Sequence, residues 1–126
     1  MLGQTDILVC LLPLTPTTTG LLNAELLACL PPNASLINFA RAAIVDDAAL
    51  HSALDTGALQ HAVLDVFLQE PLPPSSWHWQ HEHVTVLPHC SGPTDYQTAS
   101  AIVADNIQRF RDCGAVPAAV DGALGY

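Results

Sequence analysis

The sequence contains no lysine, and three arginines are its only permanently cationic side chains. Twelve Asp and Glu residues give a formal net charge of -9, which repels polyphosphate backbones and anionic lipid headgroups. We therefore expect no nucleic-acid partner and no membrane-surface partner. Each arginine is conspicuous against this background: Arg109 and Arg111 lie close together near the end of the chain, and Arg41 stands alone.

Long hydrophobic runs and a basic leader are also missing. No apolar run reaches the roughly 18 residues that cross a bilayer, and the first residues lack the basic segment of a secretory signal. The four cysteines, Cys10, Cys29, Cys90 and Cys113, form no C-x-x-C pair, so we expect a reducing, cytoplasmic compartment and no disulfides. Cys10 and Cys29 lie in apolar stretches and are predicted to be small core residues.

Several motifs of catalysis and phosphate binding are absent as well. The chain has no G-x-G-x-x-G and no G-x-S-x-G, and without lysine it has no G-x-x-x-x-G-K-[ST]. Any dinucleotide site in this chain therefore lacks the usual phosphate loop.

The residues that are present describe one folded domain. Half of the 126 residues are hydrophobic and only 12% are charged, which excludes disorder as the main state. Four short apolar segments are predicted to be strands, namely Ile7–Leu12, Ser35–Phe39, Ala62–Phe67 and Val84–Leu87, and the first is typical of a strand buried on both faces. Helical patterns separate them at 22–30 with Asn23 as the cap, from Asp46 or Asp47 to Gly57, and from about Pro93 to Cys113. This alternation predicts a parallel α/β sheet.

Parallel strands bring their carboxyl ends to one edge, where ligands of such sheets bind. Arg41 follows the second strand, and its guanidinium either binds a substrate carboxylate or forms a salt bridge to a nearby acid such as Asp46. Asp65 interrupts the apolar third strand, and a buried carboxylate needs partners. It accepts a hydrogen bond either from a ligand amide or from backbone N–H groups of a neighbouring loop.

A histidine and a glutamate are also expected at this edge. His89 follows the fourth strand, and imidazole is the usual proton donor or acceptor at neutral pH. Glu70 follows the third strand and can reach His89 if the two strands are neighbours, in which case it favours the imidazolium and fixes the tautomer. With Arg41 to hold an anion, this pair is suited to interconverting 2-oxo and 2-hydroxy acids. The alternative is that His89 only caps the last helix.

A loop before the fourth strand holds His78, His81 and His83, together with Trp77 and Trp79. The spacing H-x-x-H-x-H has enough ligands for zinc, but it matches no zinc signature. A partly exposed aromatic loop is the favoured interpretation, and no metal site is assigned.

Four ordered stretches occur at 11–23 (LLPLTPTTTGLLN), 38–50 (NFARAAIVDDAAL), 64–73 (LDVFLQEPLP) and 87–94 (LPHCSGPT). Together with the closing VDGALGY, they resemble the D-2-hydroxyacid dehydrogenase family and its glyoxylate/hydroxypyruvate reductase branch. The resemblance implies the second half of a Rossmann-like, doubly wound α/β domain, with about four parallel strands and flanking helices. Residues 1–126 are then the C-terminal part of an NAD(P)-binding catalytic domain, with a tail at 114–126. The implied activity is the NAD- or NADP-dependent reduction of small 2-oxo acids to 2-hydroxy acids.

The resemblance also implies a role for each matching residue. Arg41 is expected to bind the substrate's carboxylate and oxo group, His89 to protonate the carbonyl oxygen, and Glu70 to tune the protonation of His89. The implied cofactor-binding residues are Leu12, Pro13, Thr18, Phe39, Ala40, Arg41, Asp65, His89, Ser91 and Gly92. Ala42 stands where the family usually has glycine, so strain is expected if that position needs a positive φ.

The resemblance is limited to the C-terminal part of such enzymes. The substrate domain, the glycine-rich loop and the ribose-reading residue have no counterpart, so we expect a piece of a longer enzyme or a truncated product that is inactive by itself. The alternative function is a truncated, non-catalytic α/β module that acts in protein association. A homodimer or larger assembly is expected, because Ile7–Leu12 would otherwise be an exposed apolar edge and because the family usually dimerises through this domain.

Overall fold

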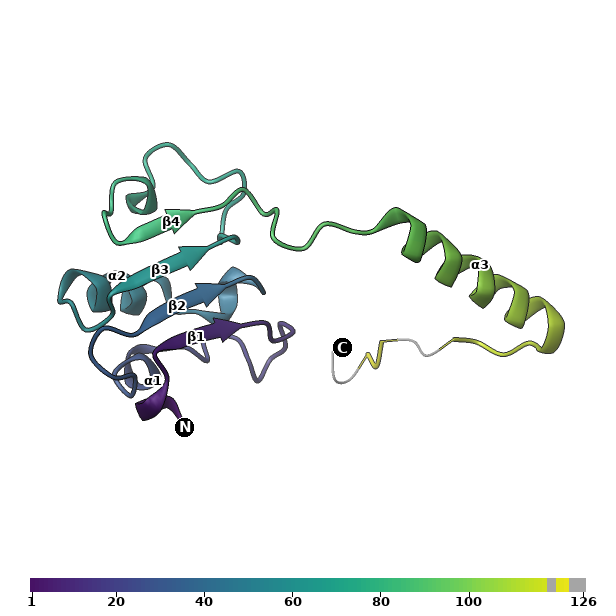
Figure 1. Ribbon diagram of the computed structural model, residues 1–126, viewed down its shortest axis with the longest axis horizontal. Coiled ribbons are helices and arrows are strands. Elements are labelled where there is room, and N and C mark those ends of the chain that lie inside the picture. Colours follow the sequence, from purple (N-terminus) through teal and green to yellow (C-terminus); the bar gives the residue numbers. More distant parts are fainter. Residues whose placement is uncertain (118–119, 123–126) are drawn as a thin grey trace. The chain divides into compact units, whose positions relative to one another are not determined.

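The computed structural model describes residues 1–117 and 120–122 of the chain, which divides into two units, Met1–Ser91 and Gly92–Tyr126. The first unit is built on a parallel sheet with the strand order β1-β2-β3-β4, and the arrows in Figure 1 all point the same way. The strands are β1 (Ile7–Cys10), β2 (Ser35–Asn38), β3 (His61–Leu64) and β4 (Val84–Val86). The predicted parallel α/β sheet is confirmed.

Each strand ends earlier than predicted, because the chain leaves the pleat to build the loops at the carboxyl edge. Interstrand hydrogen bonds still continue one residue further: Phe39 N donates to Cys10 O at 3.2 Å, and Leu87 N donates to Leu64 O at 2.9 Å. The loops therefore start from backbone that the sheet holds in place.

Two helices lie between the strands of the first unit, α1 (Ala24–Leu27) and α2 (Asp47–Asp55). Asn23 caps α1 and Asp46 caps α2, and each side-chain oxygen accepts a backbone N–H at 3.0 Å. Gly57, with φ 72°, follows α2 in the left-handed conformation that ends helices. The α1 pattern was predicted to extend to residue 30, but after Leu27 the hydrogen bonds join residues three apart and the helix stops.

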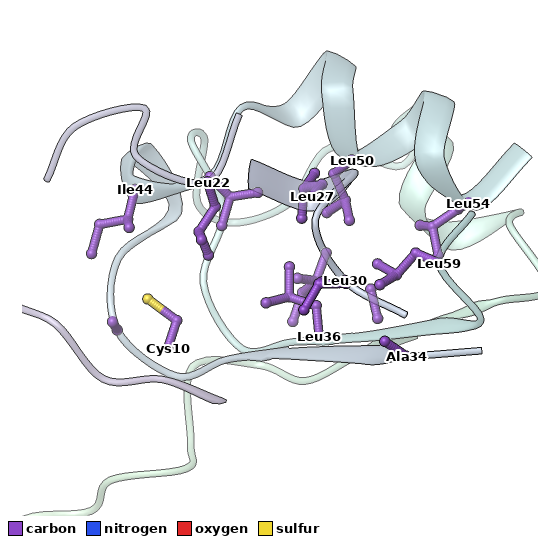
Figure 2. Close-up of a cluster of buried hydrophobic side chains, with 14 residues drawn as sticks. Cys10, Leu22, Leu27, Leu30, Ala34, Leu36, Ile44, Leu50, Leu54 and Leu59 are labelled. Atoms are coloured by element: carbon purple, nitrogen blue, oxygen red, sulfur yellow. The ribbon is translucent and has the colours of Figure 1, made fainter. Parts of the chain in front are cut away.

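The core lies between these helices and one face of the sheet (Figure 2). Leu36 of β2 is fully buried, and Leu50 and Leu54 of α2 are buried against it together with Leu27 of α1. Cys10 is a core residue, as predicted. Cys29 is not: it is exposed, because the tightened turn after α1 points it away from the core and its thiol donates to Glu25 O at 3.4 Å.

The opposite face of the sheet is less covered. In β1, Ile7 is 60% and Val9 46% exposed, whereas Ile37 and Val63 in the inner strands are half-buried. The expectation of strands buried on both faces is therefore wrong for β1. The outer strand lacks a neighbour on one side within the first unit, so its side chains lose the cover that a further strand provides.

The second unit contains one long helix, α3 (Tyr96–Cys113). Asp95 caps its start by accepting from Thr98 N at 2.7 Å, so the helix begins later than the predicted Pro93. It ends at Cys113 as predicted, and Gly114, with φ 68°, follows in the left-handed conformation. Ile102, Ile107 and Phe110 form an exposed apolar stripe along it. Part of the predicted tail, 118–119 and 123–126, lies outside the described residues.

None of the helices described in either unit combines the length and the hydropathy that spanning a membrane requires.

Candidate active site at the carboxyl edge of the sheet

The predicted contact between His89 and Glu70 is present. Because β3 and β4 are neighbours, the loops that follow them bring His89 Nδ1 within 2.8 Å of Glu70 Oε2. The other carboxylate oxygen, Glu70 Oε1, accepts the backbone N–H of Phe67 at 2.9 Å. Both oxygens of the carboxylate are therefore fixed, and both side chains remain open to solvent on one side.

The protonation of this pair follows from its contacts. The hydrogen bond with His89, followed by that from the Phe67 amide, lowers the pKa of Glu70 below its ordinary 4.5, so the carboxylate is ionised at neutral pH. A carboxylate only accepts, so His89 Nδ1 carries the proton of this bond. No hydrogen bond among the described residues engages Nε2 of His89, which leaves that nitrogen to exchange a proton with a ligand.

His89 has an unusual backbone. Its φ is 54°, in the left-handed region that side-chain-bearing residues seldom occupy. Such strained residues cluster at functional sites, where surrounding contacts hold them. Here the turn aims the next two amides, those of Cys90 and Ser91, at one carboxylate.

That carboxylate belongs to Asp65, which is only 2% exposed. Asp65 Oδ1 accepts from Cys90 N at 2.8 Å, and Oδ2 accepts from Ser91 N at 2.9 Å. Of the two interpretations of Asp65, the contact with a neighbouring loop is therefore present. Burial alone would raise the pKa of Asp65, but the hydrogen bonds from Ser91 and Cys90 outweigh burial, so the pKa lies below 3.8. The ionised side chain fastens the loop that carries His89.

Arg41 forms no ion pair with any of the described residues. Its Nη1 donates to Ala40 O at 2.7 Å, and its side chain is otherwise exposed. The proposed salt bridge to Asp46 is absent, because Asp46 caps α2 instead. The guanidinium thus has donors left for an anion.

Asn38 supports Arg41 and was not singled out from the sequence. It is 1% exposed, accepts from Ala40 N at 3.0 Å and donates to Arg41 O at 3.2 Å, and so shapes the turn after β2. An amide side chain at the end of an apolar strand was the available clue. The strain expected at Ala42 does not occur, because Ala42 starts the 3-10 helix Ala42–Ile44 with a negative φ.

The other cofactor-binding candidates of the first unit lie on the same edge. Thr18 closes the loop after β1, since its hydroxyl donates to Pro13 O at 2.7 Å and accepts from Thr15 N at 2.8 Å. Leu12, Pro13, Phe39 and Ser91 are exposed, whereas Ala40 is buried. Gly92 begins the second unit.

Beside the pair is an apolar hollow of about 490 Å³. Glu70 and His89 line it together with Phe67, Pro71, Leu72, Trp79, Val86, Leu87 and Pro88. The acid–base pair therefore borders a space from which polar side chains are otherwise absent.

The three histidines of the loop before β4, His78, His81 and His83, do not meet at one point. His78 is buried between Ser76 Oγ at 2.7 Å and Asp47 Oδ1 at 2.9 Å, whereas His81 faces Asp55. The H-x-x-H-x-H spacing therefore does not bring its three histidines to one point. Trp77 stacks against His78 with ring centroids 3.9 Å apart and Trp79 is exposed, as expected of a partly exposed aromatic loop.

A parallel α/β sheet with an acid–base pair and a free arginine at its carboxyl edge is half of a Rossmann-like nucleotide-binding fold. Residues 1–91 match the family model described as D-isomer specific 2-hydroxyacid dehydrogenase, NAD binding domain, and the chain belongs to this family.

Three relatives illustrate the similarity. Glyoxylate/hydroxypyruvate reductase A of Salmonella paratyphi B is 42% identical over 125 residues, 99% of this chain and 40% of that protein. A D-isomer specific 2-hydroxyacid dehydrogenase of Xanthobacter autotrophicus Py2, solved with NADPH and MES, is 45% identical with a TM-score of 0.92, covering 99% of this chain and 52% of that one. An NADPH-dependent glyoxylate/hydroxypyruvate reductase of Sinorhizobium meliloti, solved with NADP and sulfate, is 40% identical with a TM-score of 0.89, covering 99% and 41%. The chain thus spans about two fifths to one half of the length of these relatives.

Replacing Asp65 with asparagine should loosen the loop after β4. Asparagine offers one acceptor oxygen where two amides need one each, so one partly buried N–H loses its partner, at a cost of about 1–3 kcal/mol at neutral pH. Because folding lowers the pKa of Asp65, its contribution is full above the unfolded value near 3.8 and is lost as the pH falls through the folded value. Urea unfolding of Asp65→Asn and the parent should therefore differ at pH 7 and converge in strong acid. The exposed Asp6→Asn is the control, and an Asp65→Asn deficit that persists unchanged in acid would contradict the assignment.

Proposed function

We propose that this chain supplies the acid–base and anion-binding residues of an NAD(P)-dependent oxidoreductase that reduces small 2-oxo acids, of the glyoxylate or hydroxypyruvate type, to 2-hydroxy acids. The observation that carries the proposal is the 2.8 Å contact of His89 with an ionised Glu70, at the edge that also presents Arg41 without an ion pair among the described residues. The names of the Salmonella and Sinorhizobium relatives support this substrate class. The same names do not favour the alternative of a non-catalytic association module.

The residues present fit one end of a dinucleotide. Exposed Leu12, Pro13 and Phe39 offer apolar contacts for a nicotinamide ring, and Asp65 has lone pairs left to accept from its carboxamide. The phosphate loop is absent from the sequence, so the pyrophosphate needs residues beyond those of this chain. NADPH in the Xanthobacter structure and NADP in the Sinorhizobium structure support a nicotinamide cofactor. When bound, such a cofactor supplies a hydride to the carbonyl carbon.

The residues of this chain then bind the substrate carboxylate and transfer the proton. Arg41 holds the substrate carboxylate through parallel hydrogen bonds, which orients the oxo group. His89 Nε2 gives its proton to the carbonyl oxygen as the C=O electron pair moves onto that oxygen. His89 is left neutral and takes a proton from water for the next turnover. Ionised Glu70 stabilises the imidazolium through Nδ1–H and keeps Nε2 directed outward.

We also propose that the chain self-associates, as a homodimer or larger species, through the uncovered side of β1. β1 is the outer strand of the sheet, and its side chains are apolar and exposed, 60% at Ile7 and 46% at Val9, which is the kind of edge strand that pairs with another strand. The four cysteines are free, which supports a reducing, cytoplasmic location.

The catalytic roles are tested by joining this chain to the portion of the Salmonella relative that it does not span, and following NADPH oxidation with glyoxylate. The chimera should turn over, whereas the turnover number of the 126-residue chain alone should stay well below about 1 per second.

In the chimera, His89→Asn should lower kcat by about 10²–10⁴-fold, because the proton donor is lost. Arg41→Ala should mainly raise KM. His61→Gln, a histidine away from this edge, is the control, and full activity of His89→Asn or Arg41→Ala would refute the assigned roles.

Glu70→Gln should change the pH dependence of the same chimera. Reduction requires a protonated His89, and the carboxylate charge favours that form. Without the charge, the alkaline fall in kcat should begin at a lower pH, while KM for glyoxylate changes little. If the pH profile is unchanged and KM alone rises, Glu70 acts in binding.

Self-association is tested by light scattering coupled to size exclusion at micromolar concentration. The parent chain should elute as a dimer or larger species. Val9→Lys should shift it toward monomer, because a charge on an edge strand opposes pairing. Val116→Lys, at a position 72% exposed in the second unit, is the matched control. A monomeric parent would refute the proposal.

A further inference from the structure

Three side chains of the kinds that bind metal ions meet at the amino edge of the sheet, opposite the site at the carboxyl edge. His51 and Asp55 lie one helical turn apart on α2, and His81 comes from the loop that leads into β4. His51 Nε2 is 3.6 Å from Asp55 Oδ2, and His81 Nε2 is 3.3 Å from Asp55 Oδ1. The three ligand atoms all lie within 4.8 Å of one another. Neither the proposed reaction nor the family match uses this cluster.

We propose that His51, Asp55 and His81 form a zinc site that clips the end of α2 to the loop before β4. Zinc binds imidazole nitrogen and carboxylate oxygen at about 2.0–2.2 Å, and in a tetrahedron such ligands lie about 3.3–3.5 Å apart. The carboxylate faces both imidazoles, with Oδ1 3.3 Å from His81 and Oδ2 3.6 Å from His51, and a small turn of the Asp55 side chain brings one oxygen to that spacing from both rings. Water completes the tetrahedron from the solvent side.

The two imidazoles are held in place before any ion arrives. The His51 ring stacks on Trp77 with centroids 4.0 Å apart, and the His81 ring meets Trp77 edge-on at 5.7 Å. Trp77 is itself fixed, because its indole N–H donates to Asp47 at 3.0 Å. The His81 side chain is 11% exposed, so the ion would bind at the margin of packed aromatic rings.

An ion can also reach the site. Asp55 is exposed, and with His81 it lines an open hollow of about 690 Å³ that also contains Glu82 and His83. The formal net charge of -9 raises the local concentration of cations around the chain.

Zinc binding breaks one hydrogen bond of the metal-free site. His81 Nδ1 accepts the His83 amide at 3.2 Å, so Nε2 carries the ring proton and donates it to Asp55. Zinc at Nε2 requires the proton on Nδ1, and the His83 contact is then lost. The site should therefore bind zinc with micromolar rather than nanomolar affinity.

The test is calorimetric titration of the whole chain with zinc chloride after metal removal by a chelator. Exposed Cys29, Cys90 and Cys113 are first replaced by serine, because thiolates also bind zinc. One equivalent should bind at about pH 7.5, with a higher Tm than the metal-free chain. His51→Gln, at a half-buried position of α2, and Asp55→Asn, at an exposed one, should each weaken binding by at least roughly tenfold.

His61→Gln is the matched control, since His61 lies on β3 and pairs with Thr85 at 2.9 Å. Its zinc affinity should equal that of the parent. Cobalt(II) in place of zinc gives a second readout, because intense visible absorption reports a tetrahedral site. Absence of binding, unchanged affinity in both His51→Gln and Asp55→Asn, an equal loss in His61→Gln, or binding as tight at about pH 5 as at pH 7.5 would each overturn the proposal.

Discussion

The buried carboxylate of Asp65 is the contact on which the carboxyl edge depends. It stands at the end of β3 but satisfies two amides of the loop after β4, so it joins the ends of neighbouring strands. Without it, two backbone N–H groups would lack partners where the chain leaves the sheet. The loop position of His89, and through it the contact with Glu70, follows from this anchor. A charge that is itself expensive to bury is thus stabilised because each of its two oxygens accepts a backbone hydrogen bond.

The two edges of the sheet have different chemistry. At the carboxyl edge, Arg41 and His89 are exposed and offer donors to a small anion. At the amino edge, His51 and His81 are oriented by Trp77 toward one carboxylate. Parallel topology produces this separation, because every loop that follows a strand lies at one end and every loop that precedes a strand lies at the other.

The sequence predicted what depends on short-range pattern and strand order. The four strands, the caps Asn23 and Asp46, and the Glu70–His89 contact all follow from apolar runs, cap chemistry and adjacent parallel strands. Predictions failed where the position of a residue depends on the exact end of a helix or on contacts between distant segments. Cys29 followed a helical pattern, but the tightened turn after Leu27 turned it outward. The cluster with His51 escaped notice because it joins a helix to a loop 26 residues beyond Asp55, and no local spacing records that approach.

The left-handed backbone of His89 also restricts which residues that position can accept. Glycine and asparagine tolerate the conformation readily, but neither can give up a proton near neutral pH. Valine and isoleucine are excluded by their branched Cβ. Histidine is compatible with the backbone and with the proposed proton transfer, so position 89 should tolerate far less variation than exposed Pro88 and Cys90 on either side.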